Sequence, residues 1–101
     1  MNNGLSAHIR AAFLERVPLD TIQKTESVKQ AMRRFGLKDE DLIKHMQHAA
    51  IKEAHVKRNK LYFIVEIRHA KQLLALAYTA EEDQDHKNSL VFWLCSIRPL
   101  V

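Results

Sequence analysis

Apolar residues in the first quarter of the chain repeat at helical spacing. One recurs at every fourth position from Leu5 to Val17, which predicts a helix over residues 6–16 with a single buried stripe. Pro18 then ends this helix or begins the next turn. Residues 18–24 show no clear period, so they predict either a docked loop or an early helical turn.

Two further helices are predicted before the middle of the chain. Apolar positions three and four residues apart predict a helix over 26–35, with Thr25 as its N-cap and Gly36 as the left-handed residue that ends it. The acidic run 39–41 opens another helix, because carboxylates are favoured at the positive end of the helix dipole. We expect that helix to end near Ala50.

The period then changes to one typical of strands. Aromatic, β-branched and aliphatic residues fill 61–68, 73–80 and 90–98, and 51–57 is predicted as a shorter edge strand. The connections are short enough for hairpins, which indicates an antiparallel meander. The fold class is therefore predicted as α+β, with two to three N-terminal helices packed on one face of a three- to four-stranded antiparallel sheet.

Length and composition limit the organisation of the protein. The 101 residues predict a single domain over 1–101, helical in 1–50 and forming the sheet in 51–101. No apolar run approaches the roughly 20 residues that cross a bilayer, and no signal peptide is evident, so we expect a cytoplasmic protein with no membrane contact. The single cysteine, Cys95, predicts a buried thiol rather than a disulfide framework.

Alternation along the strands predicts which side chains share a face. The face toward the helices should carry Phe63, Val65, Ile67, Leu74, Leu76, Tyr78, Val91, Trp93, Cys95 and Ile97. The opposite, open face should carry Tyr62, Ile64, Glu66, Arg68, Leu73, Ala75, Ala77, Thr79, Phe92, Leu94, Ser96 and Arg98. In a meander the second and fourth strands run the same way, so Glu66 and Arg68 should lie at the same end as Ser96 and Arg98.

That end of the sheet has the residue types of a phosphodiester-directed site. The carboxylate of Glu66 can act as a general base, and the guanidiniums of Arg68 and Arg98 can bind phosphate in bidentate fashion. A simpler interpretation makes Glu66 the partner of Arg98 or Arg68 in a cross-strand ion pair. The pattern alone leaves both interpretations open.

Other residues extend the candidate site. His55 is the best candidate acid or base among six histidines, because it lies near Lys57 and Arg58 in the predicted edge strand and turn. The RNA-binding candidates are Arg68, Lys57, Arg58, Tyr62 and Ser96. Tyr62 can stack a base or cover a protein interface. His45 and His48 have the i, i+3 spacing of a metal pair, but no supporting motif accompanies them, so neither a metal nor another cofactor is expected.

Two segments resemble a known family. The run SVKQAMRRFGL over 27–37, followed by KDEDLIKHM, resembles the helix–Gly–helix opening of small bacterial domains related to the RelE and BrnT toxins. Met32, Gly36 and Leu37 match that opening, and the closing CSIRPL resembles the last strand of the family, which often ends in Arg-Pro. The resemblance spans about residues 25–100.

The resemblance implies a compact RelE-like sheet and metal-independent RNA cleavage, in which basic side chains on the sheet face bind phosphate and stabilise the transition state. Of the family's functional residues, Arg98 carries over. Ser27, Ala31 and Phe35 stand where the family has His, Arg and Arg. The catalytic candidates of this chain are therefore His55, Glu66 and Arg98.

Two functions follow from these patterns. The first is an RNA-directed protein of the RelE/BrnT toxin type, a candidate metal-independent endoribonuclease with a cognate antitoxin as partner. The formal charge of +4 is compatible with a polyanionic partner. The alternative is a non-catalytic interaction module, such as an immunity protein, inhibitor or adaptor, whose apolar open face binds another protein or a second copy of itself.

Overall fold

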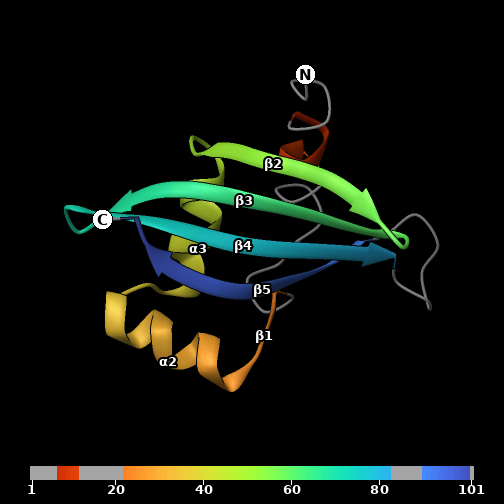
Figure 1. Ribbon diagram of the computed structural model, residues 1–101. Helices are drawn as coiled ribbons and strands as arrows, with labels where there is room; N and C mark the ends of the chain where they lie inside the picture. Colours follow the sequence, from red (N-terminus) through yellow and green to blue (C-terminus); the bar gives the residue numbers. More distant parts are fainter. Residues whose placement is uncertain (1–6, 12–21, 83–89, 101) are drawn as a thin grey trace.

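A computed structural model of the protein describes residues 7–11, 22–82 and 90–100 (Figure 1). Its elements are β1 (Gln23–Lys24), α2 (Glu26–Phe35), α3 (Asp39–Met46), β2 (Ala50–Lys57), β3 (Lys60–His69), β4 (Gln72–Glu82) and β5 (Leu90–Pro99). Residues 7–11 are also helical, and the remainder of the predicted helix over 6–16 lies outside the described residues. The predicted α+β class is confirmed.

The sheet corrects the predicted meander in two respects. It has five strands in the order β1-β5-β4-β3-β2, and β1 runs parallel to β5. The helices therefore do not form an unbroken N-terminal block, because β1 lies between residues 7–11 and α2. A two-residue strand has no periodicity by which the sequence could reveal it. Tertiary contacts hold it instead: β1 pairs with Trp93 and Leu94 of β5, and the Lys24 ammonium lies 2.9 Å from the Asp39 carboxylate. The same ammonium also donates locally to the carbonyl of Ile22 at 2.9 Å.

Helix α2 has the ends that the sequence predicts. The Thr25 hydroxyl accepts a hydrogen bond from the Val28 N–H at 3.3 Å, which satisfies a donor that the helix leaves free. At the other end Gly36 has φ +72° and ψ 27°, and the Leu37 N–H reaches back to the Met32 carbonyl at 2.8 Å. This left-handed turn directs the chain into α3.

Helix α3 ends at Met46 rather than near Ala50 as predicted. Arg10, from the helical residues 7–11, donates to the carbonyls of Gln47 at 3.0 Å and Ala49 at 2.7 Å. These two carbonyls follow the last helical turn and have no partner within the helix. The Arg10 guanidinium, which is distant in sequence, supplies their hydrogen bonds. Because α3 ends at Met46, β2 can begin at Ala50.

The large side chains that are fully buried in the described residues gather on one side of the sheet. Figure 1 shows α3 behind the strands and α2 beside the β5 edge. The buried cluster joins both helices to β3, β4 and β5 through Val28, Met32, Leu42, Met46, Phe63, Val65, Ile67, Leu74, Leu76, Tyr78, Phe92 and Leu94. Within it the Phe63 and Tyr78 rings stack 5.2 Å apart, and Phe63 meets Phe92 edge-on. The opposite face of the sheet has no described helix over it.

The predicted faces are right for β3 and β4 and wrong for the first half of β5. The register shifts between Ala77, which pairs with Ser96, and Tyr78, which pairs with Leu94, so Cys95 is an extra residue in β5. The extra residue reverses the alternation. Phe92 and Leu94 were predicted on the open face but are buried in the core. The prediction placed Val91, Trp93 and Cys95 in the core, but Val91 and Trp93 are only partly buried and Cys95 is exposed.

Substituting Gly36 tests the helix–helix turn. A Cβ at this position would meet nothing within 4 Å, so the cost of Gly36→Ala arises from the left-handed backbone alone. We expect a loss of about 1 kcal/mol in the free energy of unfolding, measured by urea denaturation. Lys29→Ala, on the exposed side of α2, is the control and should change stability by less than about 0.5 kcal/mol.

Candidate nucleic-acid interface on the open sheet face

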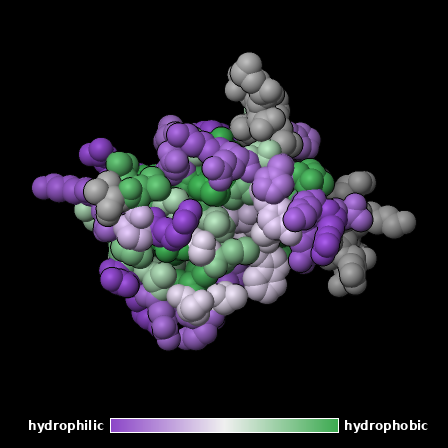
Figure 2. All heavy atoms as spheres, in the orientation of Figure 1, coloured by the Kyte–Doolittle hydropathy of each residue, from purple (hydrophilic) through white to green (hydrophobic). Residues whose placement is uncertain are grey.

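The face of the sheet opposite the core combines aromatic, small and basic side chains. Figure 2 shows it in the orientation of Figure 1, with hydrophilic residues gathered along β2 and around the rim, and a paler to apolar centre over β4 and β5. Strand pairing arranges the side chains in rows across the strands. One row contains His55, Tyr62, Thr79 and Trp93, and a parallel row nearer the other end contains Ala50, Glu66, Ala75 and Arg98.

A hollow of about 360 Å³ opens between the two irregular strands. Strand β2 has its own extra residue between Lys52 and His55, where Glu53 has φ +54°, and β5 has Cys95. The hollow lies between these two bulges, and Ala77 and Thr79 of β4 also line it. Bulges bend a strand and redirect its side chains, and small residues in the central strand leave space between them. The result is an indentation of the size that a flat organic group fills.

His55 is held in a defined tautomer at the rim of this hollow. Its Nδ1 donates to the backbone carbonyl of Glu53 at 3.1 Å, because a carbonyl oxygen can only accept. The neutral ring therefore keeps its lone pair on Nε2. The ring also stacks on Tyr62 with centroids 5.4 Å apart and an interplanar angle of 7°. Together the two rings form a flat aromatic surface beside the hollow.

The carboxylate of Glu66 is paired with Lys52, at 3.0 Å. In the ion-pair interpretation of the sequence, the predicted partner of Glu66 was Arg98 or Arg68, and the structure places Lys52 there instead. Both charges are partly solvated, with the Lys52 side chain 54% and the Glu66 side chain 35% exposed, so the pair adds little to stability. Its main effect is on charge: because Lys52 neutralises Glu66, Arg98 has no ion-pair partner among the described residues.

The remaining candidates lie around the rim. Ser96 is next to Arg98, opposite Ala77. Lys57 and Arg58 are exposed at the β2–β3 turn, where Arg58 and Asn59 both have positive φ, the backbone of a tight two-residue hairpin. Arg68 lies near the other end of β3 and borders a groove at the end of α3. The basic groups thus surround the aromatic row rather than meeting at one point.

The three catalytic candidates are not brought together. Glu66 and Arg98 share a row but flank Ala75, so their Cα atoms are about 10 Å apart at the usual strand spacing. His55 pairs with Tyr62, four residues before Glu66 on β3, which is about 13 Å along the strand. The arrangement therefore presents separate contacts to an extended ligand rather than a compact acid–base pair.

Trp93 is a candidate site residue that the alternation pattern wrongly places in the core. It is only partly buried and lies in the row with Tyr62. Its neighbour Cys95 is exposed, with its sulfur 3.6 Å from the Thr79 hydroxyl. No residue type in β5 marks the bulge. The one available signal was that Trp is less often fully buried than Phe or Leu, which favours Phe92 and Leu94 for the core.

Two other histidines form a hydrogen-bonded chain away from this face. His69 Nε2 donates to the Gly36 carbonyl at 3.0 Å, so its Nδ1 accepts from His45 Nε2 at 3.0 Å. Desolvation, and then the nearby His69 ring, lower the pKa of His45 below its usual 6.5. His45 thus bonds His69 rather than pairing with His48, and no cluster of three metal-ligating side chains occurs among the described residues.

Comparisons with protein-family models, with curated proteins and with solved structures find no match to this chain. Among the described helices, none has the length and apolar character needed to cross a membrane. The geometry of the open face is therefore the basis for inferring a function.

The histidine chain predicts a pH-dependent stability. Because folding lowers the pKa of His45, the unfolded chain binds its proton more readily. The free energy of unfolding should therefore be highest above pH 6.5. It should fall as the pH drops through 6.5 toward the lower pKa that His45 has in the folded protein. His45→Gln should reduce this dependence and cost about 1 kcal/mol at pH 7.5 through the lost hydrogen bond.

Urea denaturation at pH 7.5 and 5.5 measures both effects. His48→Gln is the matched control, because His48 is exposed on the turn that follows α3. Equal pH dependence in the wild type and His45→Gln would contradict the assignment.

Proposed function

We propose that the protein is a cytoplasmic RNA-directed protein whose open sheet face binds single-stranded RNA. The observation that carries this proposal is the row of aromatic groups on that face, in which His55 stacks on Tyr62 and Trp93 lies two strands away across Thr79. Unpaired bases stack on exposed aromatic rings, and every base has a face that can do so.

Charge supports the same partner. Lys57 and Arg58 lie beyond one end of the aromatic row, and Arg98 lies toward the other. None of the three has an acidic partner within the described part of the chain. A strand of RNA that crosses the face can place bases on the rings and phosphates near these cations. The separation of the candidates, unfavourable for a compact catalytic centre, suits an extended polyanion.

Binding is measured by fluorescence anisotropy with a labelled single-stranded 10-nucleotide RNA. Tyr62→Ala should weaken binding about tenfold or more through lost stacking. Arg98→Gln should weaken it less and make the slope of log K against log salt shallower by about 0.7, the contribution of one phosphate contact to a single strand. The protein has a single tryptophan, so quenching of Trp93 fluorescence reports contact at the face itself.

Arg33→Gln is the matched control for charge. Arg33 is exposed on α2 and lies 4.0 Å from Glu26, so its loss removes the same net charge from another part of the surface. The proposal fails if Arg33→Gln and Arg98→Gln weaken binding equally, or if RNA binds without altering Trp93 fluorescence. A concentration-dependent dimer that quenches Trp93 without RNA would instead support the interaction module, with the same face binding a second copy.

Cleavage is the second candidate function, and the tautomer of His55 favours it. The free Nε2 can accept a proton from a 2′-hydroxyl. Arg98 lies in the other row, about 13 Å away along the strands, so it can bind a neighbouring phosphate of the same RNA but not the phosphate that is cleaved. We expect any cleavage to persist in EDTA and to fall by at least about 100-fold in His55→Ala, with RNA affinity reduced far less.

Gel analysis of the 10-nucleotide RNA after incubation with each variant measures this rate. Intact RNA after incubation with folded wild-type protein that binds it would exclude the nuclease and leave the binding proposal standing.

A further inference from the structure

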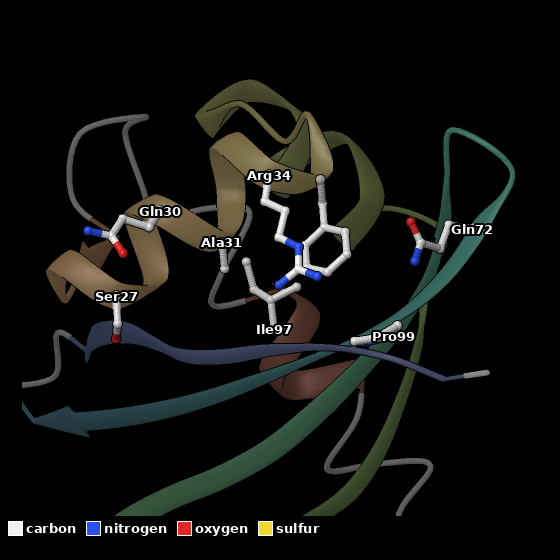
Figure 3. A pocket seen from close by; sticks show the side chains of 8 residues that line it. Ser27, Gln30, Ala31, Arg34, Gln72, Ile97 and Pro99 are labelled. Carbon is white, nitrogen blue, oxygen red and sulfur yellow. The ribbon is translucent and has the colours of Figure 1, made fainter.

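A second indentation lies away from the open face, between α2 and the C-terminal half of β5 (Figure 3). Its volume is about 370 Å³. It exists because β1 pairs with β5 only at Trp93 and Leu94, so no described strand continues along the outer edge of β5. Helix α2 lies beside that edge instead.

The uncovered edge of β5 offers a backbone donor. The Leu100 N–H donates to the carbonyl of Leu73 at 2.9 Å, one step beyond the paired Leu74 and Pro99, so Leu100 and Leu73 occupy a hydrogen-bonded position of the ladder. Such pairs alternate with non-bonded pairs along an antiparallel ladder. Ile97, three residues earlier, therefore points its N–H and C=O away from β4, and Ile97 is part of the lining. Pro99 points the same way and has no N–H to contribute.

One cation extends into this space. The Arg34 side chain descends from α2 toward Ile97 (Figure 3). Its guanidinium lies 5.7 Å from the centroid of the Phe35 ring, and no hydrogen bond or ion pair within the described residues involves it. No acidic residue lines the groove. The preceding Arg33, by contrast, faces Glu26 at 4.0 Å.

The rest of the lining is neutral. Ser27, Gln30 and Gln72 supply uncharged hydrogen-bonding groups, and Ala31, Phe35, Ile97 and Pro99 supply apolar surface. A single guanidinium balances a single negative charge, and its planar fork matches a carboxylate. A phosphate monoester has nearly two negative charges at neutral pH, so one of them would have no cation to balance it in this groove.

We propose that this groove binds a monocarboxylate that has an apolar or aromatic body. The carboxylate meets the Arg34 guanidinium, and the body lies on the apolar wall formed by α2 and the end of β5. A free organic acid and the C-terminus of a peptide share this chemistry. A peptide can in addition pair its backbone with the exposed edge at Ile97, as in strand addition.

The test is a ¹⁵N–¹H NMR titration of the full chain. The probes are phenylacetate for a free acid and acetyl-glycyl-phenylalanine for a peptide terminus, each compared with its neutral amide. We expect saturable shifts at Ala31, Phe35 and Ile97, with Tyr62 and Ala77 on the open face unaffected. The amides should bind about tenfold more weakly, because they lack the charge-assisted hydrogen bonds to Arg34.

Three variants locate the charge. Arg34→Gln should weaken the binding of both acids about tenfold, and Arg34→Lys should give an affinity between those of the wild type and Arg34→Gln. Arg33→Gln should change the affinity less than twofold. A higher affinity for the peptide than for phenylacetate would identify a chain terminus as the ligand, and the reverse order a free acid.

The proposal is overturned if neither acid gives saturable shifts, if acids and amides bind equally, or if Arg33→Gln matches Arg34→Gln. Stronger shifts with inorganic phosphate than with both acids would also overturn the assignment to a carboxylate.

Discussion

The extra residue at Cys95 is the constraint on which the open face depends. A strand in regular alternation would place Trp93 on the same side as Ile97, against the helices. The bulge lets Phe92 and Leu94 enter the core before it and Ile97 after it. Both halves of β5 thus pack apolar side chains against the helices, while Trp93, Ser96 and Arg98 all take the other side. Without the extra residue, either Trp93 or the pair Ser96 and Arg98 would turn toward the helices, and the open face would lose its aromatic row or its basic end.

The matching irregularity in β2 has the same consequence at the other edge. The extra residue beside Glu53 keeps Lys52 and His55 on the open face. Lys52 can then neutralise Glu66, and His55 can stack on Tyr62. Two bulges therefore shape the hollow and also select the groups around it. The central strands β3 and β4 remain regular, which is what the buried core requires.

The two proposed sites use different parts of the same sheet. The proposed RNA-binding site is the face that the helices leave uncovered, whereas the proposed carboxylate groove lies at the edge of β5 that β1 leaves unpaired. The face offers stacking surfaces and dispersed cations, as an extended polyanion requires. The groove offers one cation and an apolar wall, as a small monoanion requires. Since the groove residues come from α2 and the strand ends, a variant at Arg34 leaves the aromatic row intact.

Local pattern in the sequence determined most of the elements. The caps at Thr25 and Gly36, the strands β3 and β4, and the shared end of Glu66 and Arg98 follow from periodicity, helix-end chemistry and hairpin direction, which act over a few residues. Only the tertiary structure decided the parallel strand β1, the end of α3, the partner of Glu66 and the inner face of β5. Each of these depends on a group distant in the chain, such as Arg10 at the end of α3, or on a bulge whose position depends on how the whole core packs.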